Sequence, residues 1–294
     1  MTDERTSGPD FLCIGAQKGG TQWLYDQLAS HPQFWMPPIK ELHCLDLPAK
    51  QLEKARKILR KVGRNPEKYN ARQREKHRPT VEARDVAFLE KLIDLPRIVD
   101  VDRYCSLFDG KGESITGDIT PAYSALEPPT ITRLAERLPD LKVVFIARDP
   151  VERLWSQYSM KIRKKQAPEV IGVDAVLAFA SLPSIVSRSF PSRIVDHWRS
   201  FFPKEQVGLF FFDELRTDAA GIRKKILGFI GADIASQSGE LSPGHNSKQR
   251  LKKYAMTNEV RAALCDYFAE EISLCAEHFG GPALGWGGRG KPSG

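Results

Sequence analysis

The stretch that decides the fold is FLCIGAQKGGTQWLYDQL, residues 11–28. Its apolar beginning, Phe11 to Ile14, predicts a short buried strand, and the glycines that follow predict a tight turn. Trp23, Leu24 and Leu28 then recur at helical spacing. A strand, a glycine-rich turn and a helix start in this order form a cradle for a phosphate group. The N–H groups of the first helical turn and the helix dipole both favour an anion there.

The turn after this strand carries side chains suited to such a cradle. Gly19 and Gly20 let the backbone approach a phosphate closely. Lys18 supplies a mobile cation, and Thr21 supplies a hydroxyl donor. The order differs from GxxxxGK[ST], in which the lysine follows the glycines, and from GxGxxG. For this segment alone, a turn whose glycines only permit the bend is the alternative interpretation.

Three more short apolar runs follow, at residues 114–117, 142–147 and 207–212, and longer helical patterns separate them. Strands that alternate with helices predict a parallel sheet covered on both faces. The predicted fold class is therefore α/β, with a central parallel sheet flanked by helices. Ligands of such sheets bind at the carboxyl ends of the strands, so the residues after each run are candidates for a site.

A second anion-binding pattern follows the third strand, in ARDPVERLWSQY, residues 147–158. Arg148 stands at the carboxyl end of that strand, where a guanidinium can bind a phosphate with two hydrogen bonds. Pro150 is suited to the first turn of a helix, and Ser156 comes two helical turns after Arg148. Taken alone, Arg148 fits a surface ion pair equally well.

Together these segments resemble the PAPS-dependent sulfotransferase family, especially the branch with the heparan-sulfate sulfotransferases and bacterial relatives. KGGT matches its 5′-phosphosulfate loop, and the segment from Arg148 matches its 3′-phosphate signature R-[ND]-P-V-x-R-x-x-S-x-Y. Three more motifs keep the family order: KELH at 40–43, GDITPAY at 117–123 and VGLFFFDEL at 207–215. The resemblance spans residues 11–231, with a weaker match at 245–247 and in the closing helices. It implies the P-loop-like sulfotransferase fold.

The resemblance also implies an activity: transfer of a sulfuryl group from 3′-phosphoadenosine 5′-phosphosulfate (PAPS), with PAP as product, to a hydroxyl or amine. The acceptor class stays open among carbohydrates, lipids and natural products. Lys18 is expected to stabilise the leaving phosphate, and Lys40 is expected either to act as a second cation or only to pair with neighbours of Glu41. Asp118 is the favoured base, and Glu41 and His43 are alternatives. The residues expected to bind the donor are Gln17, Lys18, Gly19, Gly20, Thr21, Gln22, Trp23, Arg148, Ser156, Lys248 and Arg250.

The chain departs from the family pattern at several positions. Gln22 replaces a usual Ser or Thr, which removes a hydroxyl contact to the 5′ side. Cys44 and Leu45 replace an aromatic pair, so the acceptor pocket is expected to have a different shape. Asp118 stands where Glu is common. Lys248, Arg250, Lys252 and Lys253 are expected either to close over the 3′-phosphate or to begin a solvated helix.

The charge balance suggests an anionic ligand or partner, because 44 Lys and Arg against 37 Asp and Glu give a net charge of +7. Residues 50–78 hold twelve of the cations and only three acids, and the apolar residues of the first half recur at helical spacing. We expect a basic helical insertion there, either a solvated surface or a wall for an acidic substrate. Nucleic acid is a less favoured partner for residues 50–78, because Tyr69 is the only aromatic residue of this segment.

Other features narrow the function classes. The five cysteines include no CxxC pair and are expected to be free, mostly buried thiols. The six histidines show no metal-binding spacing, so no metal is expected. No apolar run approaches the roughly 20 residues that cross a bilayer. With a polar N-terminus, the chain is interpreted as cytoplasmic and not membrane-inserted.

We expect one sulfotransferase domain over residues 11–284, between a flexible N-terminus at 1–10 and a flexible tail at 285–294. A small-molecule or glycan acceptor is the expected partner. Three alternatives stay open. A nucleotide kinase or NTPase would explain the phosphate loop, although it requires a lysine after the glycines. A basic nucleic-acid-binding protein would explain the charge. A relative that binds the nucleotide without transferring a group would explain both.

Overall fold

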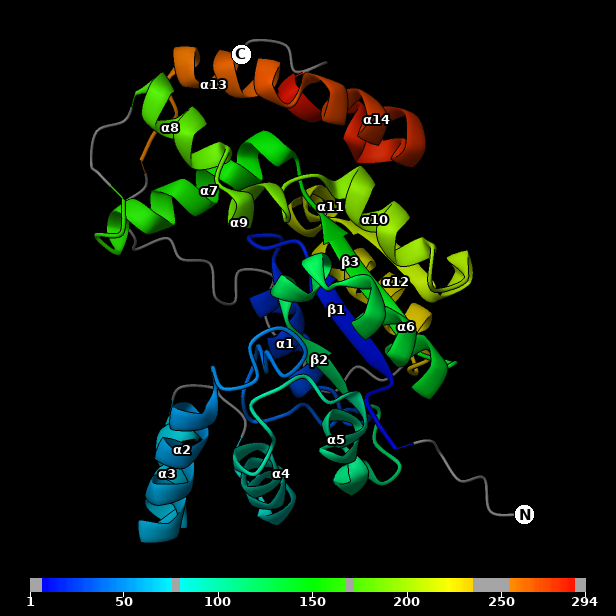
Figure 1. The fold of residues 1–294 in the computed structure, drawn as a ribbon. Helices are drawn as coiled ribbons and strands as arrows, with labels where there is room; N and C mark the ends of the chain where they lie inside the picture. The colour runs from blue at the N-terminus through cyan, green and yellow to red at the C-terminus, as the bar shows by residue number, and fades with distance from the viewer. Residues whose placement is uncertain (1–6, 76–79, 168–171, 235–253, 289–294) are drawn as a thin grey trace.

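The computed structural model describes residues 7–75, 80–167, 172–234 and 254–288 (Figure 1). Four strands form a single parallel sheet in the order β2-β1-β3-β4. The strands are β1 (Phe11–Gly15), β2 (Gly117–Ile119), β3 (Lys142–Ala147) and β4 (Val207–Phe211). The expected α/β fold with a central parallel sheet is confirmed.

The register brings the ends of the strands to one edge. Phe11 pairs with Gly117 of β2 and with Lys142 of β3, and Val143 pairs with Val207 of β4. All five residues of β1 are buried, as expected for a central strand covered on both faces. The loops that follow β1, β2 and β3 therefore meet at the carboxyl edge of the sheet.

Helices cover both faces because successive side chains of a strand point to opposite sides. Phe11 and Cys13 of β1 pack in one apolar cluster with α1 (Thr21–Ala29) and α12 (Ala219–Ile230). Leu12 and Ile14 pack in the other cluster, which includes side chains of α5 (Val101–Ser106), α6 (Pro128–Arg137) and α10 (Pro191–Arg199).

The remaining helices lie at two ends of the molecule (Figure 1). At one end are α2 (Leu52–Arg64), α3 (Pro66–Glu75) and α4 (Ala83–Ile93). At the other are α7 (Pro150–Arg163), α8 (Val173–Ala180), α9 (Pro183–Val186), α13 (Asn258–Tyr267) and α14 (Ala269–Phe279). Short elements complete the described parts: η1 (Asp109–Lys111), η2 (Pro121–Ala125), η3 (Lys204–Gln206), α11 (Phe212–Thr217) and η4 (Gly281–Gly288).

The second strand lies later in the sequence than the run at 114–117 predicted. The backbone of Ile115 pairs with residues 33–35 instead of β1, and β2 begins only at Gly117. Gly117 suits this position because a Cβ there would lie 2.3 Å from the Phe11 ring. As a consequence, Asp118 lies within a strand, opposite Leu12, and does not follow the end of one as we expected.

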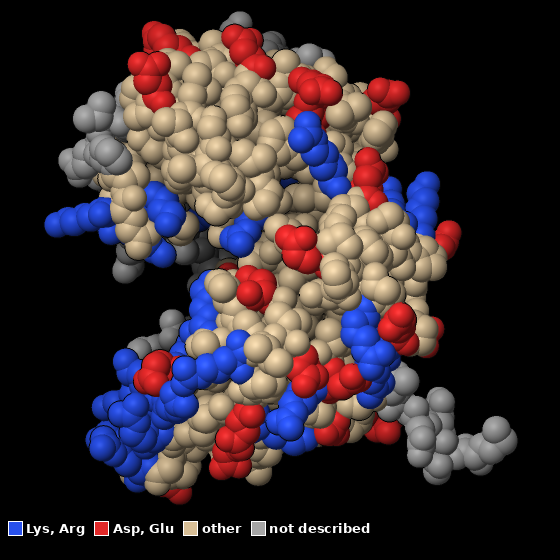
Figure 2. Space-filling view, in the orientation of Figure 1, with Lys and Arg blue, Asp and Glu red and all other residues tan. Residues whose placement is uncertain are grey.

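The basic segment forms α2 and α3. Leu52, Ala55 and Val62 are the buried residues of α2, whereas α3 buries none, and α2 packs on α4. Figure 2 shows Lys and Arg side chains gathered over α2 and α3, beside a hollow in the surface. The expectation of an amphipathic helix with a basic outer face holds for α2.

The packed unit extends beyond both boundaries expected from the sequence. Trp286 is 2% exposed, and its indole N–H donates to Asp213 at 3.1 Å. Trp286, which we expected in the tail from residue 285, is therefore packed against the domain. At the other end, Lys111 bonds Asp10 at 2.7 Å, so Asp10 is not part of a free N-terminus. None of the helices in the described parts combines the length and hydropathy that a bilayer crossing requires.

Candidate functional site

The loop between β1 and α1 is closely packed against the end of β3. The N–H of Ala16 donates to the carbonyl of Ile146 at 2.8 Å, and the N–H of Gly19 donates to Ala16 at 2.9 Å. A Cβ on Gly19 would lie 2.7 Å from the Ile146 oxygen, which leaves no space for a side chain. Lys18 and Gly20 both have positive φ, 71° and 88°. The chain thus turns sharply, and α1 begins directly after it at Thr21.

Arg148 joins the second predicted segment to this loop. It follows the last residue of β3, and its Nη1 donates to the carbonyl oxygen of Lys18 at 2.7 Å. Its guanidinium also lies over the ring of Phe212, 4.4 Å from the ring centre. Burial lowers the pKa of Arg148, but a guanidinium remains charged at neutral pH. The two predicted anion-binding segments therefore meet at one point.

The helix after Arg148 starts as predicted. Asp149 caps α7 by accepting hydrogen bonds from the N–H groups of Val151 and Glu152, and Pro150 is its first residue. Ser156 lies on this helix and is partly exposed. α7 also reaches the phosphate loop, since Nζ of Lys18 lies 3.8 Å from Sδ of Met160.

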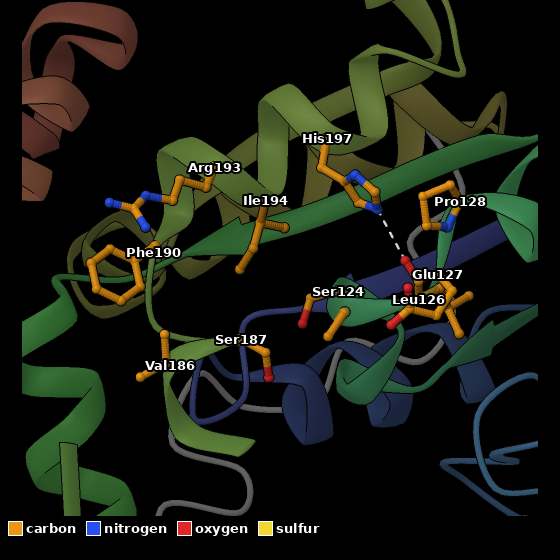
Figure 3. Close-up of a pocket in the computed structure, with 11 residues that line it drawn as sticks. Ser124, Leu126, Glu127, Pro128, Val186, Ser187, Phe190, Arg193, Ile194 and His197 are labelled. Carbon is orange, nitrogen blue, oxygen red and sulfur yellow. Dashed lines mark hydrogen bonds between the residues drawn. The ribbon is translucent and has the colours of Figure 1, made fainter. Parts of the chain in front are cut away.

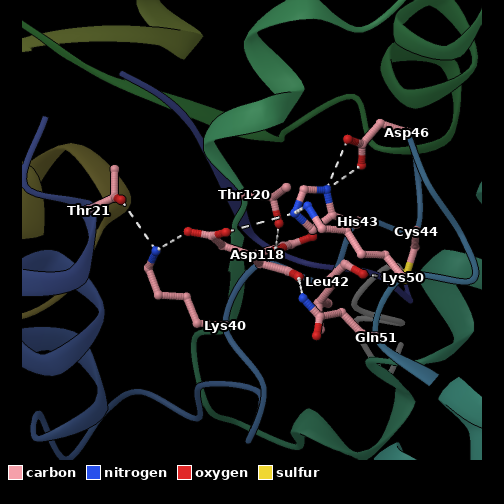
Figure 4. Close-up of polar contacts among 11 residues, drawn as sticks. Thr21, Lys40, Leu42, His43, Cys44, Asp46, Lys50, Gln51, Asp118 and Thr120 are labelled. Carbon is pink, nitrogen blue, oxygen red and sulfur yellow. Dashed lines mark hydrogen bonds and ion pairs between the residues drawn. The ribbon is translucent and has the colours of Figure 1, made fainter. Parts of the chain in front are cut away.

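The KELH segment also contacts the loop (Figure 4). Lys40 Nζ donates to the hydroxyl of Thr21 at 3.3 Å and to Glu41 Oε1 at 3.0 Å. Gln51 donates to the carbonyl of Glu41 at 2.6 Å and fixes the backbone there. Lys40 and Glu41 are thereby held beside the first residue of α1.

Glu41 and His43 form a charged cluster with Asp46 and Lys50. His43 Nδ1 lies 2.9 Å from Asp46, and its Nε2 lies 3.8 Å from Glu41 and 2.7 Å from Lys50 Nζ. The interaction with the nearby His43 ring, with help from the charge of Lys40, lowers the pKa of Glu41 to about 2. Burial alone would lower the pKa of His43, but its bonds to Asp46 and Glu41 outweigh burial and raise it. Glu41 is ionised at neutral pH.

Asp118 is enclosed by donors. Its side chain is buried, with the residue 1% exposed, and it accepts hydrogen bonds from Thr120 at 2.7 Å and from the hydroxyl of Tyr104 at 3.3 Å. Burial raises the pKa of Asp118 to about 6, although bonds from Thr120 and Tyr123 oppose the shift. The Glu41 side chain, by contrast, is 44% exposed.

The other residues expected to bind the donor differ in their burial and in their hydrogen-bond partners. Gln17 and Trp23 each bury one polar atom, Oε1 and Nε1, that has no hydrogen-bond partner among the described residues. Gln22 is exposed and donates to Asp26 one turn later on α1. Lys248, Arg250, Lys252 and Lys253 lie outside the described residues.

The sequence reasoning missed Asp46 and Lys50 as partners of His43, and Tyr104 as a partner of Asp118. The three-residue spacing from His43 to Asp46 was the only available signal, and it is weak because such spacings are common. All five cysteines are free as expected, and only Cys265 is partly exposed. In the parts of the chain that the structure describes, no three His, Cys, Asp or Glu side chains are grouped to hold a metal ion.

Comparisons with known proteins identify the family and the fold of the chain. The sulfotransferase family model matches residues 9–236. A sulfotransferase from Alicyclobacillus acidocaldarius has a similar structure, with 24% identity, 92% of this chain and 94% of that chain covered, and a TM-score of 0.60. A sulfotransferase from Mycobacterium avium is 14% identical, with 92% and 77% covered and a TM-score of 0.53. The sulfotransferase domain from the curacin biosynthetic pathway is 12% identical, with 90% and 99% covered and a TM-score of 0.51. No protein of curated function matches the sequence.

Proposed function

The chain belongs to the sulfotransferase family, and from this premise we propose that it transfers a sulfuryl group from PAPS to a hydroxyl or amine of a small-molecule or glycan acceptor. The observation that carries the proposal is the bond from Arg148 to the carbonyl of Lys18 at 2.7 Å. It joins the cation expected at the 3′-phosphate to the loop expected at the 5′-phosphosulfate. One nucleotide with phosphates at both ends fits this arrangement.

The residues present fit such a donor. The close packing of Gly19 against the main chain of Ile146 fixes the tight turn that forms the backbone cradle, and the buried Oε1 of Gln17 has a hydrogen-bonding capacity that no described residue uses. Lys18 and the N–H groups after it would hold the 5′ end, and Arg148 with Ser156 would hold the 3′-phosphate. When bound, PAPS supplies an activated sulfuryl group.

The protein would supply countercharge through lysines. Lys18 lies in the loop, and Lys40 bonds Thr21 at the start of α1 at 3.3 Å. Negative charge develops on the leaving phosphate oxygen as the S–O bond breaks, and a cation placed there stabilises the transition state more than the ground state. Removing one preorganised donor of this kind typically costs roughly 3–4 kcal/mol. We expect Lys18→Ala to lower turnover at least a hundredfold, about 2.7 kcal/mol.

For the base we propose Glu41 in place of Asp118, which the resemblance favoured. A base must reach the acceptor proton. Glu41 is 44% exposed and is linked through Lys40 to Thr21 beside the loop, whereas Asp118 is 1% exposed and already accepts bonds from Thr120 and Tyr104. We assign Asp118 to holding β2 and the residues around it in place.

In this proposal His43 and Asp46 are positioning residues. Asp46 lies 2.9 Å from Nδ1 of His43, which orients the ring toward Glu41. The His43 ring thereby holds the Glu41 carboxylate in place and keeps it ionised, ready to take the acceptor proton. A rescue of His43→Ala by added imidazole, absent in Glu41→Gln, would support this role.

The test is calorimetric titration with PAP in the absence of Mg²⁺, with ATP as the comparison. Wild type is expected to bind PAP with micromolar affinity and to prefer it over ATP. Arg148→Ala and Lys18→Ala are expected to lose most of that affinity, and Ser156→Ala part of it. Lys224→Gln, an exposed cation on α12, is the matched control and should bind like wild type.

Three other outcomes of these binding and transfer experiments would indicate a different function. Preference for ATP with Mg²⁺ would indicate a kinase or NTPase. No nucleotide binding, with salt-dependent binding of nucleic acid instead, would indicate that the basic surface carries the function. PAP binding without transfer from labelled PAPS to any acceptor would indicate an inactive relative.

A further inference from the structure

A cavity of about 440 Å³ lies between η2 and the helices α9 and α10 (Figure 3). Its volume is within the range of small-molecule sites. Ser124 and Leu126 line it on the side of η2, and Val186, Phe190 and Ile194 line it on the side of α9 and α10. None of the residues assigned above to the donor or to the chemistry lines this cavity.

One wall of the cavity lies against the end of β1, where the phosphate loop begins. Ser124 lies on its wall, and the Cβ of Ser124 is 3.7 Å from the position that a Cβ on Gly15 would take. η2 follows β2 at the carboxyl edge of the sheet and contacts β1. A molecule in the cavity therefore lies at the same edge as the proposed donor.

The opposite wall is fixed to the helix that carries the 3′-phosphate motif. Arg153 of α7 is completely buried, and its guanidinium donates to the hydroxyl of Ser189 at 2.5 Å and to Gln157 at 2.6 Å. Ser189 in turn donates to the carbonyl of Ile185 at 2.6 Å. These bonds hold the α9–α10 connection, and hence Phe190, in a fixed position relative to α7.

The charges of the cavity are separated. Arg193 stacks on Phe190, 4.5 Å from the ring centre, and it makes no ion pair with a described residue. Glu127 lies near the other end, beside His197, whose Nε2 bonds the carbonyl of Leu126 at 3.0 Å (Figure 3). An anion at Arg193 would therefore lie away from the carboxylate of Glu127.

We propose that this cavity is the acceptor pocket of the sulfotransferase proposed above, and that its acceptor is a small amphipathic molecule with one anionic group. The anionic group binds Arg193, and the apolar body packs on Phe190 and Ile194. The group to be sulfated lies at the Ser124 side, toward the phosphate loop. The net charge of +7 draws such an anion to the molecule.

The test measures ligand-observed NMR binding of four probes: 4-hydroxyphenylacetate and octanoate, each with its neutral amide. Wild type is expected to bind each acid three to ten times more tightly than its amide, because an exposed guanidinium gives a modest preference for a carboxylate. Arg193→Gln should remove this preference, and the control Lys224→Gln should keep it. Ile194→Trp fills the cavity and should abolish binding of all four probes.

Ser187→Trp, at the exposed rim of the cavity, replaces Ile194→Trp if the core substitution unfolds the protein. PAP titration of the same variants separates the two proposals, because the pocket variants should keep wild-type PAP affinity. No binding of any probe to wild type, or binding that neither Trp substitution reduces, overturns the acceptor pocket. Failure of wild type to bind PAP overturns the proposed function, whatever the probes do.

Discussion

Arg148 and Lys18 are 130 residues apart in the sequence, yet the guanidinium of Arg148 donates to the main-chain oxygen of Lys18 at 2.7 Å. The bond is possible because Arg148 ends β3, the strand that pairs with β1, and the loop that carries Lys18 leaves β1 at the same edge. The arginine holds the loop through its backbone. Because this bond uses the main chain of Lys18, the lysine side chain can contact other groups.

The packing of Gly19 predicts that Gly19→Ala damages the loop. Its Cβ would meet two main-chain oxygens, of Ile146 at 2.7 Å and of Ala16 at 2.9 Å, and backbone atoms cannot move aside as a flexible side chain does. Overpacking of this kind typically costs about 1–3 kcal/mol. We expect a lower midpoint of urea unfolding and at least a tenfold loss of PAP affinity, measured by calorimetry.

The matched control is Gly63→Ala on α2. A Cβ there meets nothing within 4 Å. Gly63 lies in the last turn of α2 without a positive φ, and alanine has a higher helix propensity than glycine by up to about 1 kcal/mol. We expect a slightly stabilised protein with unchanged PAP affinity. A Gly19→Ala protein with wild-type PAP affinity would show that the loop does not hold the nucleotide.

The sequence predicted those parts of the fold and site that depend on the pattern of apolar and turn residues within a short segment. The apolar runs of β1, β3 and β4 are short and continuous, and turn residues bound them, so their positions follow from the residues themselves. Arg148 was predicted at a strand end for the same reason. β2 was misplaced because only three residues pair with β1, and neighbouring Ile115 pairs elsewhere.

The partners within the site could not be predicted, because tertiary packing decides them. Asp118 was expected to follow the end of a strand, but the fold places it within β2 and buries it against Tyr104. Glu41 looked less suitable as a base, yet its side chain stays exposed next to Lys40. Our proposal of Glu41 over Asp118 as the base rests on the burial of the two carboxylates, which cannot be read from the order of the residues.

The burial of Trp286 predicts that the C-terminal residues stabilise the domain. Trp286 is 2% exposed, packs edge-on against Phe211, and bonds Asp213. Truncating a buried tryptophan to alanine typically costs about 3–5 kcal/mol. We expect Trp286→Ala, or a chain ending after residue 284, to unfold at clearly lower urea concentration. Leu284→Ala is the control, because Leu284 is 61% exposed and should have little effect.

The environment of Asp118 predicts how Asp118→Asn changes stability with pH. The folded-state pKa of Asp118 is about 6, above the unfolded value of about 3.9. Between these values the folded state holds a proton that the unfolded state has lost, so stability falls as pH rises through this window. Asparagine does not ionise. We expect the stability of the variant relative to wild type to rise by about 2–3 kcal/mol from pH 4 to pH 7, measured by urea unfolding at each pH. A difference that stays constant with pH would contradict the raised pKa of Asp118.

The different pKa values of Glu41 and Asp118 predict which pH profile the reaction will show. A base must be ionised, and the pKa is about 2 for Glu41 but about 6 for Asp118. If Glu41 is the base, loss of its charge will not reduce turnover between pH 7 and pH 4. If Asp118 is the base, turnover falls about tenfold per pH unit below 6.

The measurement is release of PAP from PAPS by wild type, Glu41→Gln and Asp118→Asn over this pH range. We expect Glu41→Gln to lower turnover at every pH, toward the lower end of the 10²–10⁴-fold that a positioned base typically contributes, because a carboxylate with a pKa of about 2 is a weak base. The ratio of wild-type to Asp118→Asn turnover should stay nearly constant, since ionisation of the donor affects both proteins equally. A ratio that falls steeply below pH 6, with Glu41→Gln retaining activity, would return the role of base to Asp118.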